Sequence, residues 1–415
     1  MQFDEAVKYL LGLGHETLAI KLGLRNTELL LQALENPERA FTAVQIAGTN
    51  GKGSTAVMLD SICRVARINT GLYTSPHLVS ITERIRINGA DITTGDFARH
   101  TTTVRAAAED LLARKEIEAL PTFFEHVTAI ALIAFREAGV ELAILETGLG
   151  GRLDSTTAAK AAFVGITSIA MDHEDYLGPT LTSIASEKAA VIRPGVTAVI
   201  AEQPPEALRV LLDRCAAVGV QPSLDPGRNF AEKISLSLRG AHQIENASVA
   251  IGLAEALRMH GFSISDEQIG VGLAEATHPG RLELIPPFVL DGAHNPAGAQ
   301  ALRDYLDELE HGAVTLIFGA MSNKRLDRIA ETLFPVADVL VLTTVQDPRS
   351  ATLETLAPLA KQFARGTVIE TTASDEAIRT AIAGTPKDGL ICVTGSLYLI
   401  GETRPMILKL AEETV

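Results

Sequence analysis

Tryptophan is absent from this 415-residue chain, and aromatic residues make up only 4% of it. The core must therefore be built mainly from aliphatic side chains, which fits a hydrophobic content of 47%. Cysteine is also rare: Cys63, Cys215 and Cys392 lie far apart in the sequence. Three such cysteines form neither a CxxC pair nor a disulfide framework, which is typical of a protein in the reducing cytosol.

Positive charge is scarce as well. The chain has 36 Lys and Arg residues against 51 Asp and Glu residues, for a formal net charge of −15. This balance argues against nucleic acid or an anionic membrane as a partner, but not against ATP, whose phosphates need only a local positive pocket. No apolar run approaches the ~20 residues that span a bilayer. The N-terminal sequence MQFDEAVKYL carries two acids and lacks the apolar core of a secretory signal. We expect a cytoplasmic location.

The length of the chain predicts two domains. Pro and Gly cluster between Thr277 and Pro287, as is typical of a linker. We place the boundary there, with a first domain of residues 1–285 and a second of residues 286–415.

The strongest chemical pattern lies in residues 43–67. Ala43 to Ala47 is an apolar run of strand length, and Ser54 to Arg67 has a helical apolar period. Between them, a glycine-rich turn contains Lys52 and leads into Ser54. Such a turn points backbone N–H groups and a helix N-terminus at a phosphate, although the spacing is not that of a Walker A motif. The alternative is a glycine-rich turn with a solvated lysine.

A second apolar run, Val140 to Leu145, ends in Glu146 and is followed by the glycine-rich segment 148–154. A buried strand that delivers a carboxylate beside a phosphate loop is the Walker B arrangement for a magnesium ligand. The alternative interpretation is an acid on a solvated turn.

Other polar residues leave two interpretations open. Ser75 precedes a helix-breaking proline in a loop, which is either an ordinary surface loop or part of a site. His173 follows the apolar strand Phe163 to Thr167 and is either a structural histidine or a ligand. Lys188 lies in a small-residue helix, where it is a surface lysine paired with Glu or part of a site. Glu125 stands three residues after Thr122, a capping-box spacing that gives it a structural role.

The remaining pattern is that of an α/β protein. Apolar runs at 196–201 and 234–238 are expected to form strands. In the second domain, a strand leads into Asp291 and a helix follows from about 297 to 309. Further strands, at 314–318, 339–342, 367–369 and 390–393, alternate with helical stretches and predict a parallel sheet with right-handed crossovers.

Six segments together resemble one family. They read GTNGKGS at 48–54, SPHL at 75–78, ETGLGGRLD at 146–154, DHxxxLG at 172–178, HQxxN at 242–246 and DGAHNP at 291–296. In this combination and order the chain resembles the folylpolyglutamate synthase and dihydrofolate synthase family of Mur-type amide ligases. The resemblance implies an N-terminal P-loop ATPase-type domain with a mainly parallel sheet and a smaller C-terminal Rossmann-like α/β domain.

The resemblance also implies an activity: ATP-dependent addition of L-glutamate to folate, and also to 7,8-dihydropteroate, through an acyl phosphate. It implies ATP and two magnesium ions as cofactors, and domains that close on the nucleotide. Lys188 would be carboxylated on its side-chain nitrogen. We expect a monomer whose partners are these small molecules.

Roles for individual residues follow from the same resemblance. The expected nucleotide contacts are Thr49, Asn50, Gly51, Lys52, Gly53, Ser54, Asn246, Arg281, Asp291 and His294. The expected metal ligands are Ser75, Glu146, His173 and Lys188 as the carbamate. The expected substrate contacts are Thr122, Phe123, Phe124, Glu125, Leu153, Asp154 and Ser155. Lys52, His173 and Lys188 are the expected catalytic residues.

One position departs from the family pattern, because Lys21 stands where an acidic residue usually lines the pterin end of the substrate site. The sequence therefore leaves the preferred pterin open. Two alternatives to a folate ligase are a Mur-type ligase acting on a cell-wall precursor and a P-loop NTP-dependent switch. A Rossmann dehydrogenase fits worst, because no GxGxxG turn follows a strand with an acid about 20 residues on.

Overall fold

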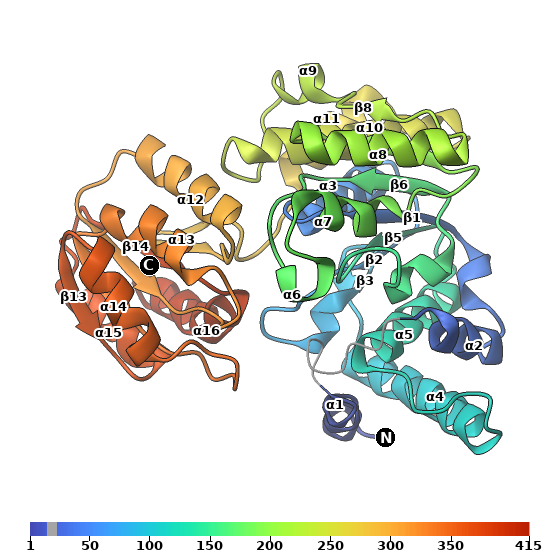
Figure 1. Cartoon of the computed structure of the whole chain (residues 1–415), viewed down its shortest axis with the longest axis horizontal. Helices are drawn as coiled ribbons and strands as arrows, with labels where there is room; N and C mark the ends of the chain where they lie inside the picture. Colours follow the sequence, from blue (N-terminus) through green and yellow to red (C-terminus); the bar gives the residue numbers. More distant parts are fainter. Residues whose placement is uncertain (15–22, 415) are drawn as a thin grey trace. The chain divides into compact units, whose positions relative to one another are not determined.

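The computed structural model describes residues 1–14 and 23–414, so Lys21 lies outside the described residues. The chain folds into two compact units (Figure 1). The first unit comprises Met1–Ile169, Leu177–Ser237 and Ile244–Ala276. The second comprises Ala170–Tyr176, Leu238–Gln243 and Thr277–Val415, and so takes in two short segments from earlier in the chain.

The first unit is built around an eight-stranded sheet with the strand order β4-β3-β2-β5-β1-β6-β7-β8. Its strands are β1 (Thr42–Ala47), β2 (Thr70–Tyr73), β3 (Ile85–Ile87), β4 (Ala90–Asp91), β5 (Leu142–Glu146), β6 (Phe163–Ile166), β7 (Thr197–Ile200) and β8 (Ser223–Leu224). The strands from β2 to β8 in this order pair in parallel, and the two edge pairings β2–β3 and β3–β4 are antiparallel. The predicted mainly parallel sheet is confirmed.

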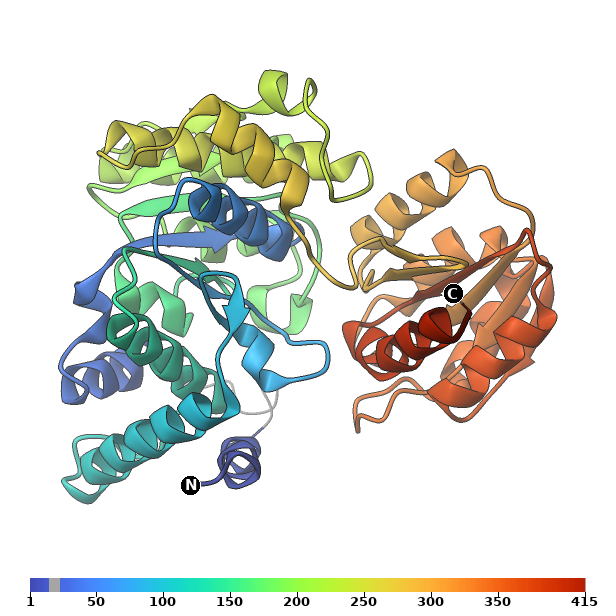
Figure 2. The same ribbon diagram turned by 180° about the vertical axis from the view of Figure 1, so that it is seen from behind.

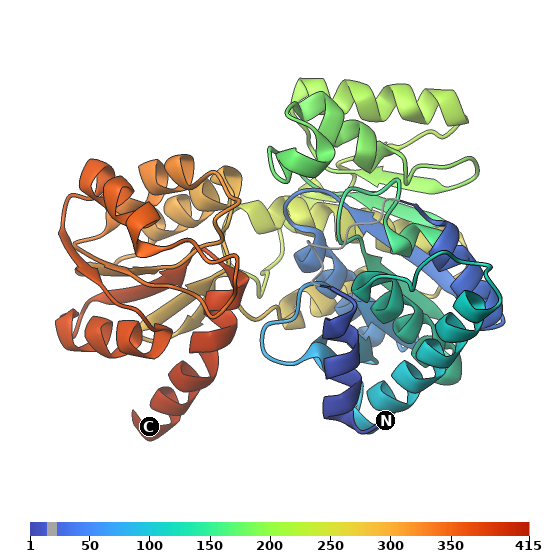
Figure 3. The same cartoon turned by 60° about the horizontal axis from the view of Figure 1, so that its bottom comes forward.

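Helices cover the sheet of the first unit. They are α1 (Phe3–Gly12), α2 (Arg25–Ala33), α3 (Lys52–Val65), α4 (Thr94–Ala113), α5 (Phe123–Glu137), α7 (Leu181–Ala189), α8 (Pro205–Val218), α9 (Arg228–Ala231), α10 (His242–Met259) and α11 (Asp266–Glu275), with short 3₁₀ turns η1 (Pro37–Ala40), η2 (Ile81–Arg84) and η3 (Ser155–Ala159). The crossovers β1-α3-β2 and β2-α5-β5 run in opposite directions along the sheet, so right-handed connections place α3 and α5 on opposite faces. Helix α11 packs on α3 (Figure 2), whereas α1 packs on α4 (Figure 3).

The second unit has a six-stranded sheet with the order β13-β12-β11-β14-β10-β9. Its strands are β9 (Glu283–Ile285), β10 (Phe288–Asp291), β11 (Val314–Phe318), β12 (Val339–Leu342), β13 (Thr367–Glu370) and β14 (Leu390–Thr394). Its helices are α6 (Glu174–Leu177, shared at its end with the first unit), α12 (Pro296–Glu308), α13 (Leu326–Leu333), η4 (Phe334–Val336), α14 (Leu353–Phe363), α15 (Ser374–Gly384) and α16 (Leu397–Thr414). Only the β9–β10 pairing is antiparallel among these strands. The predicted parallel α/β arrangement is confirmed.

One predicted strand is wrong. Residues 234–238 form bends and irregular structure instead of a strand. The Ser237 backbone N–H donates to the Leu273 carbonyl, and the Ser237 hydroxyl donates to the carbonyls of Leu273 and Ala276 at 3.0 and 2.5 Å. The polar groups of this segment are therefore taken up by the C-terminal end of α11. In the part of the chain that the structure describes, no helix combines the length and apolar character needed to cross a membrane.

Candidate functional site

The phosphate loop lies between β1 and α3, as predicted, although α3 begins at Lys52, two residues earlier than expected. Gly51 has φ +86°, and a Cβ on it would lie 1.9 Å from the Asn246 side-chain oxygen. Only glycine fits here, because the position needs both a left-handed backbone and a close approach to α10. Asn246 is thus packed directly on the loop, although it lies almost 200 residues away in the sequence.

Lys52 folds back along this loop. Its Nζ donates to the carbonyls of Gly48 and Thr49, both at 3.1 Å. The amides of Thr49 and Asn50 donate to the Ser168 carbonyl at 2.8 and 3.2 Å. The loop is therefore held by the segment that follows β6, and the positive end of the α3 dipole lies at its end.

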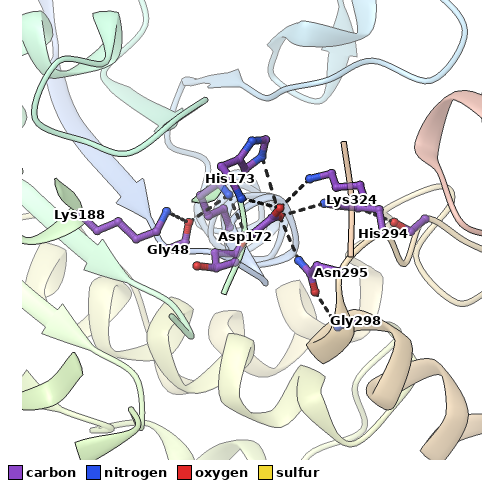
Figure 4. Close-up of polar contacts among 11 residues, drawn as sticks. Gly48, Asp172, His173, Lys188, His294, Asn295, Gly298 and Lys324 are labelled. Atoms are coloured by element: carbon purple, nitrogen blue, oxygen red, sulfur yellow. Dashed lines mark hydrogen bonds and ion pairs between the residues drawn. The ribbon is translucent and has the colours of Figure 1, made fainter. Parts of the chain in front are cut away.

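Lys188 reaches the same loop from α7. Its side chain is buried, and Nζ donates to the Gly48 carbonyl at 2.7 Å (Figure 4). Lys188 is therefore not on the surface, and the alternative of a surface lysine paired with Glu is wrong. The Lys188 amine therefore contacts the phosphate loop directly. The spacing of the two segments along the sequence did not predict this contact.

Glu146 ends β5 beside the strand that leads into the phosphate loop, in register with Ile46. Its side chain is buried, and Oε2 accepts a hydrogen bond from the Ser75 amide at 3.0 Å. The structure thus brings together two of the predicted metal ligands. Among the described residues, no group of three His, Cys, Asp or Glu side chains is arranged so that it could hold a metal ion by itself. A divalent ion here would therefore draw on hydroxyl and phosphate oxygens besides this carboxylate.

The predicted capping box of α5 is present. The Glu125 carboxylate accepts from the Thr122 amide at 2.7 Å and from the Thr27 hydroxyl at 3.0 Å. One oxygen therefore holds the start of α5 and the other joins it to α2, which favours the structural interpretation of Glu125. Phe123 lies 5.3 Å beneath the Arg84 guanidinium, a cation–π distance.

Asp154 organises the glycine-rich loop after β5. Its Oδ2 accepts from the amides of Gly148 and Leu149, both at 2.9 Å, and its Oδ1 accepts from the amide and hydroxyl of Thr156. Burial raises the pKa of Asp154, and these hydrogen bonds act in the opposite direction. The neighbouring Ser155 hydroxyl lies 2.6 Å from the Thr128 hydroxyl. Asp154 and Ser155 thus hold the loop in shape, and Leu153 is half-buried beside them.

A second cluster lies within the second unit, around Asp172. Its carboxylate accepts from Lys324 Nζ at 2.6 Å and from Asn295 Nδ2 at 3.2 Å (Figure 4). His294 Nε2 lies 3.6 Å and His173 Nε2 3.8 Å from Asp172 Oδ2. Burial alone would raise the pKa of Asp172, but the hydrogen bond and charge of His294, with the charges of His173 and Lys324, hold it well below its ordinary value. The carboxylate therefore stays ionised.

These contacts explain why Ala170–Tyr176 belongs to the second unit. Asn295 also accepts from the Gly298 amide at 2.8 Å and so caps α12 while it holds Asp172. Asp172, its four side-chain neighbours His173, His294, Asn295 and Lys324, and also Glu174, Asn323 and Arg325 line a pocket. His173 and His294, both predicted site residues, lie together here.

Asp291 lies deeper in the second unit. Its two oxygens accept from the amides of Leu282 and Ala293, both at 2.9 Å, so it fixes the turn after β10. Burial raises its pKa, and the nearby charge of Arg281 opposes that rise. His294 lies in the same turn, where its Nδ1 lies 2.8 Å from the Gly292 carbonyl.

Asp172, Asn295 and Lys324 were not among the predicted site residues. The signal for two of them was present, since Asp172 and Asn295 adjoin the predicted His173 and His294. Lys324 ends the segment 319–324, and its contact with Asp172 could not be foreseen, because Asp172 lies 152 positions earlier in the chain.

The chain is similar in sequence to known proteins. Residues 280–397 match the family model described as the Mur ligase, glutamate ligase domain. The dihydrofolate synthase/folylpolyglutamate synthase of Bacillus subtilis is 33% identical over 94% of this chain and 96% of its own length. A probable bifunctional folylpolyglutamate synthase/dihydropteroate synthase of Halobacterium salinarum is 35% identical over the whole chain. This chain spans only 53% of that archaeal relative.

Solved structures agree over nearly the full length. FolC of Escherichia coli in complex with DHPP and ADP is similar with a TM-score of 0.87 at 29% identity, covering 99% of this chain and 98% of that one. The bifunctional synthase of Yersinia pestis complexed with AMPPNP and a Mn ion gives a TM-score of 0.84 at 27% identity, covering 98% of each chain. The two α/β units with a phosphate loop define an ATP-dependent ligase of the Mur ligase superfamily. Within that superfamily, the chain belongs to the folylpolyglutamate synthase/dihydrofolate synthase family.

Proposed function

We propose that this protein joins L-glutamate to the carboxylate of a folate, and also of 7,8-dihydropteroate, at the expense of ATP. The acceptor carboxylate attacks the γ-phosphorus, ADP leaves, and an acyl phosphate forms. The glutamate amine then attacks the acyl carbon, phosphate leaves, the amine loses a proton, and an amide results. This chemistry needs positioning and charge neutralisation more than an enzyme nucleophile.

The observation that carries the proposal is the arrangement of the phosphate loop, Glu146 and Ser75 in the first unit. The loop ends at the N-terminus of α3, and the buried carboxylate of Glu146 lies at the end of the neighbouring strand. Helix N-termini bind phosphate, and strand-end carboxylates bind magnesium. Nucleotides and a Mn ion in the similar solved structures support ATP and a divalent ion for this chain.

Residues of the first unit would hold these groups. Lys52 Nζ, now on two loop carbonyls, would turn to the β- and γ-phosphates. Glu146 and the Ser75 hydroxyl would hold a magnesium ion, which supplies positive charge against the phosphate oxygens. Asn246, packed on the loop, would contact the nucleotide. Phe123 and Phe124 at the start of α5 would border the pterin.

Lys188 would carry a carboxyl group on Nζ, as the family resemblance implies. Its buried position supports this, because burial favours the neutral amine that attacks carbon dioxide. The carbamate nitrogen keeps one hydrogen, so it retains the bond to the Gly48 carbonyl. The anion is proposed as a ligand of a second magnesium ion, and His173 in the second unit stays a proposed metal ligand.

We propose residues 1–285 as the ATP- and pterin-binding domain and residues 286–415 as the domain that contributes to nucleotide and glutamate binding. Arg281 at the linker, and Asp291 and His294 in the second domain, are the proposed nucleotide contacts. Asp291 would act through the turn that it fixes, since both its oxygens accept backbone hydrogen bonds. We also propose that the protein is cytoplasmic and monomeric.

The test is release of phosphate from ATP in the presence of a pterin acceptor and glutamate. Dependence on both co-substrates is expected. Release that needs neither would indicate an NTP-dependent switch, and release only with a cell-wall precursor would indicate a Mur-type ligase of that pathway.

The same assay addresses the departure at Lys21. A carboxylate suits the donor-rich edge of a pterin ring and an ammonium does not, so tetrahydrofolate should be used with a higher kcat/KM than dihydropteroate. Equal values for the two acceptors would show that Lys21 does not determine the choice.

A further inference from the structure

A polar side chain lies in the middle of the central strand of the first unit. Gln45 is fully buried in β1, flanked by apolar residues that lead into the phosphate loop. Its amide nitrogen lies 3.1 Å from the hydroxyls of Thr147 and Thr156 and 2.7 Å from that of Thr157. A buried amide costs free energy unless its hydrogen bonds are made, so its presence calls for a physical reason.

The direction of these bonds follows from the proton of each hydroxyl. Thr156 donates its proton to Asp154 Oδ1 and Thr157 donates its own to the Gly151 carbonyl at 2.7 Å. Each threonine hydroxyl has a single proton, so both can only accept from residue 45. The two N–H groups of Gln45 supply the two donors that are needed.

The bonds continue into the loop after β5. Asp154, which accepts from Thr156, also accepts from the amides of Gly148 and Leu149. Gln45 therefore connects the strand under the phosphate loop to the backbone of residues 148–154, through hydroxyl and carboxylate in turn.

That loop rests against an aromatic side chain. A Cβ on Gly148 would lie 2.5 Å from the Phe124 ring, so the loop backbone lies against that ring. The ring centroid of Phe124 is in turn 5.8 Å from that of Tyr73. A shift of the loop at residues 148–154 would therefore move the Phe124 ring.

We propose that Gln45 is a positioning residue for the pterin acceptor, which acts through Thr156, Asp154 and the Gly148 backbone on Phe124. The inference deepens the proposed function and rests on it, since that function places the pterin beside Phe124. Strand β1, which leads into the phosphate loop, would thus also set the geometry of the acceptor pocket.

The experiment compares Gln45→Met with the wild-type protein in steady-state kinetics and in equilibrium binding of the pterin without ATP. Methionine keeps the size and removes both donors. We expect KM and Kd for the pterin to rise at least about tenfold, as loss of one buried hydrogen bond would cause, while KM for ATP stays within about twofold. Gln45→Glu should be more severe, because a carboxylate only accepts and would lie near Asp154.

Two further variants separate positioning from loss of stability. Gly148→Ala perturbs the other end of the path, at Phe124, and should reproduce the selective rise for the pterin. Leu257→Ala empties a fully buried site in α10 and changes none of the residues of this path, so it should lower the melting temperature with unchanged KM values. Should Gln45→Met fail to fold, Thr156→Val interrupts the same path and takes its place.

A parallel rise of KM for ATP and pterin, or a lower melting temperature with unchanged KM values, would overturn the proposal. A wild-type protein that neither binds nor uses a pterin would instead overturn the proposed function.

Discussion

Lys52 is the side chain on which phosphate binding depends most directly. It lies at the first position of α3 and is held by two carbonyls of the loop. In Lys52→Ala the positive charge facing the transferred phosphoryl group is lost, and contacts of this kind contribute about 10²–10³-fold to kcat. We expect phosphate release to fall by at least that factor, with Lys361→Ala on the exposed surface of α14 as the control. Near-normal activity would remove the phosphate loop from the mechanism.

The proposed carbamate on Lys188 can be tested by restoring the activity of a variant with a small anion. Lys188→Ala should fold normally and lose most activity, because the proposed carbamate is an anion that holds a metal ion. Acetate in the assay should restore part of the activity by filling the vacated anion position, whereas chloride at the same ionic strength should not. A fully active alanine variant would return Lys188 to a structural role at the Gly48 carbonyl.

The burial of His126 leads us to expect that the free energy of unfolding depends on pH. It is buried in α5, where its Nδ1 lies 3.1 Å from the Thr122 carbonyl and its Nε2 lies 3.2 Å from the Tyr9 hydroxyl. Burial lowers its pKa to about 4. The unfolded chain takes up a proton near pH 6.5 and the folded one only near pH 4, so stability is full above pH 6.5 and declines towards pH 4. The decline amounts to about 3 kcal/mol.

Calorimetric unfolding between pH 7.5 and 5 checks this, with His126→Gln as the test variant. Glutamine can donate to Thr122 and accept from Tyr9 but does not titrate, so the loss of stability on acidification should be smaller in the variant. The exposed His311→Gln serves as the control. Equal pH dependence of His126→Gln and wild type would contradict the assigned burial effect.

At the scale of elements, the start of α5 was predictable because its signal is local. Thr122 and Glu125 stand three residues apart, and the structure shows both halves of the capping box. Thr122→Ala should destabilise the first unit by about 1 kcal/mol. The measurement is urea unfolding, and Thr103→Ala on the exposed face of α4 should be close to neutral. An unchanged midpoint for Thr122→Ala would show that the cap contributes nothing.

The false strand at 234–238 shows where local signals fail. Its apolar alternation is real, but Ser237 finds its partners at the end of α11, more than 30 residues later. The polar Gln45 within the apolar run of β1 was visible in the sequence, yet its role depends on three threonines about 100 positions away. The local apolar pattern can predict a strand. The structure or role that the segment has also depends on polar partners that are distant in the sequence.

At the scale of the whole molecule, the sequence predicted two α/β units because strand and helix patterns alternate through both halves. It did not predict that Ala170–Tyr176 belongs with the later part of the chain. That assignment depends on Asp172, whose partners Asn295 and Lys324 are 123 and 152 positions away. The expected site residues fall into the two units accordingly, with His173 beside His294 and with Lys188 at the phosphate loop.

In the proposed reaction the protein activates the carboxylate of the pterin-containing acceptor as an acyl phosphate and joins it to glutamate. The most direct measurement uses an acceptor labelled with ¹⁸O in that carboxylate, with mass spectrometry of both products. We expect one ¹⁸O atom in each phosphate released and an acceptor longer by one glutamyl residue. Unlabelled phosphate, or phosphate released without a lengthened acceptor, would contradict it.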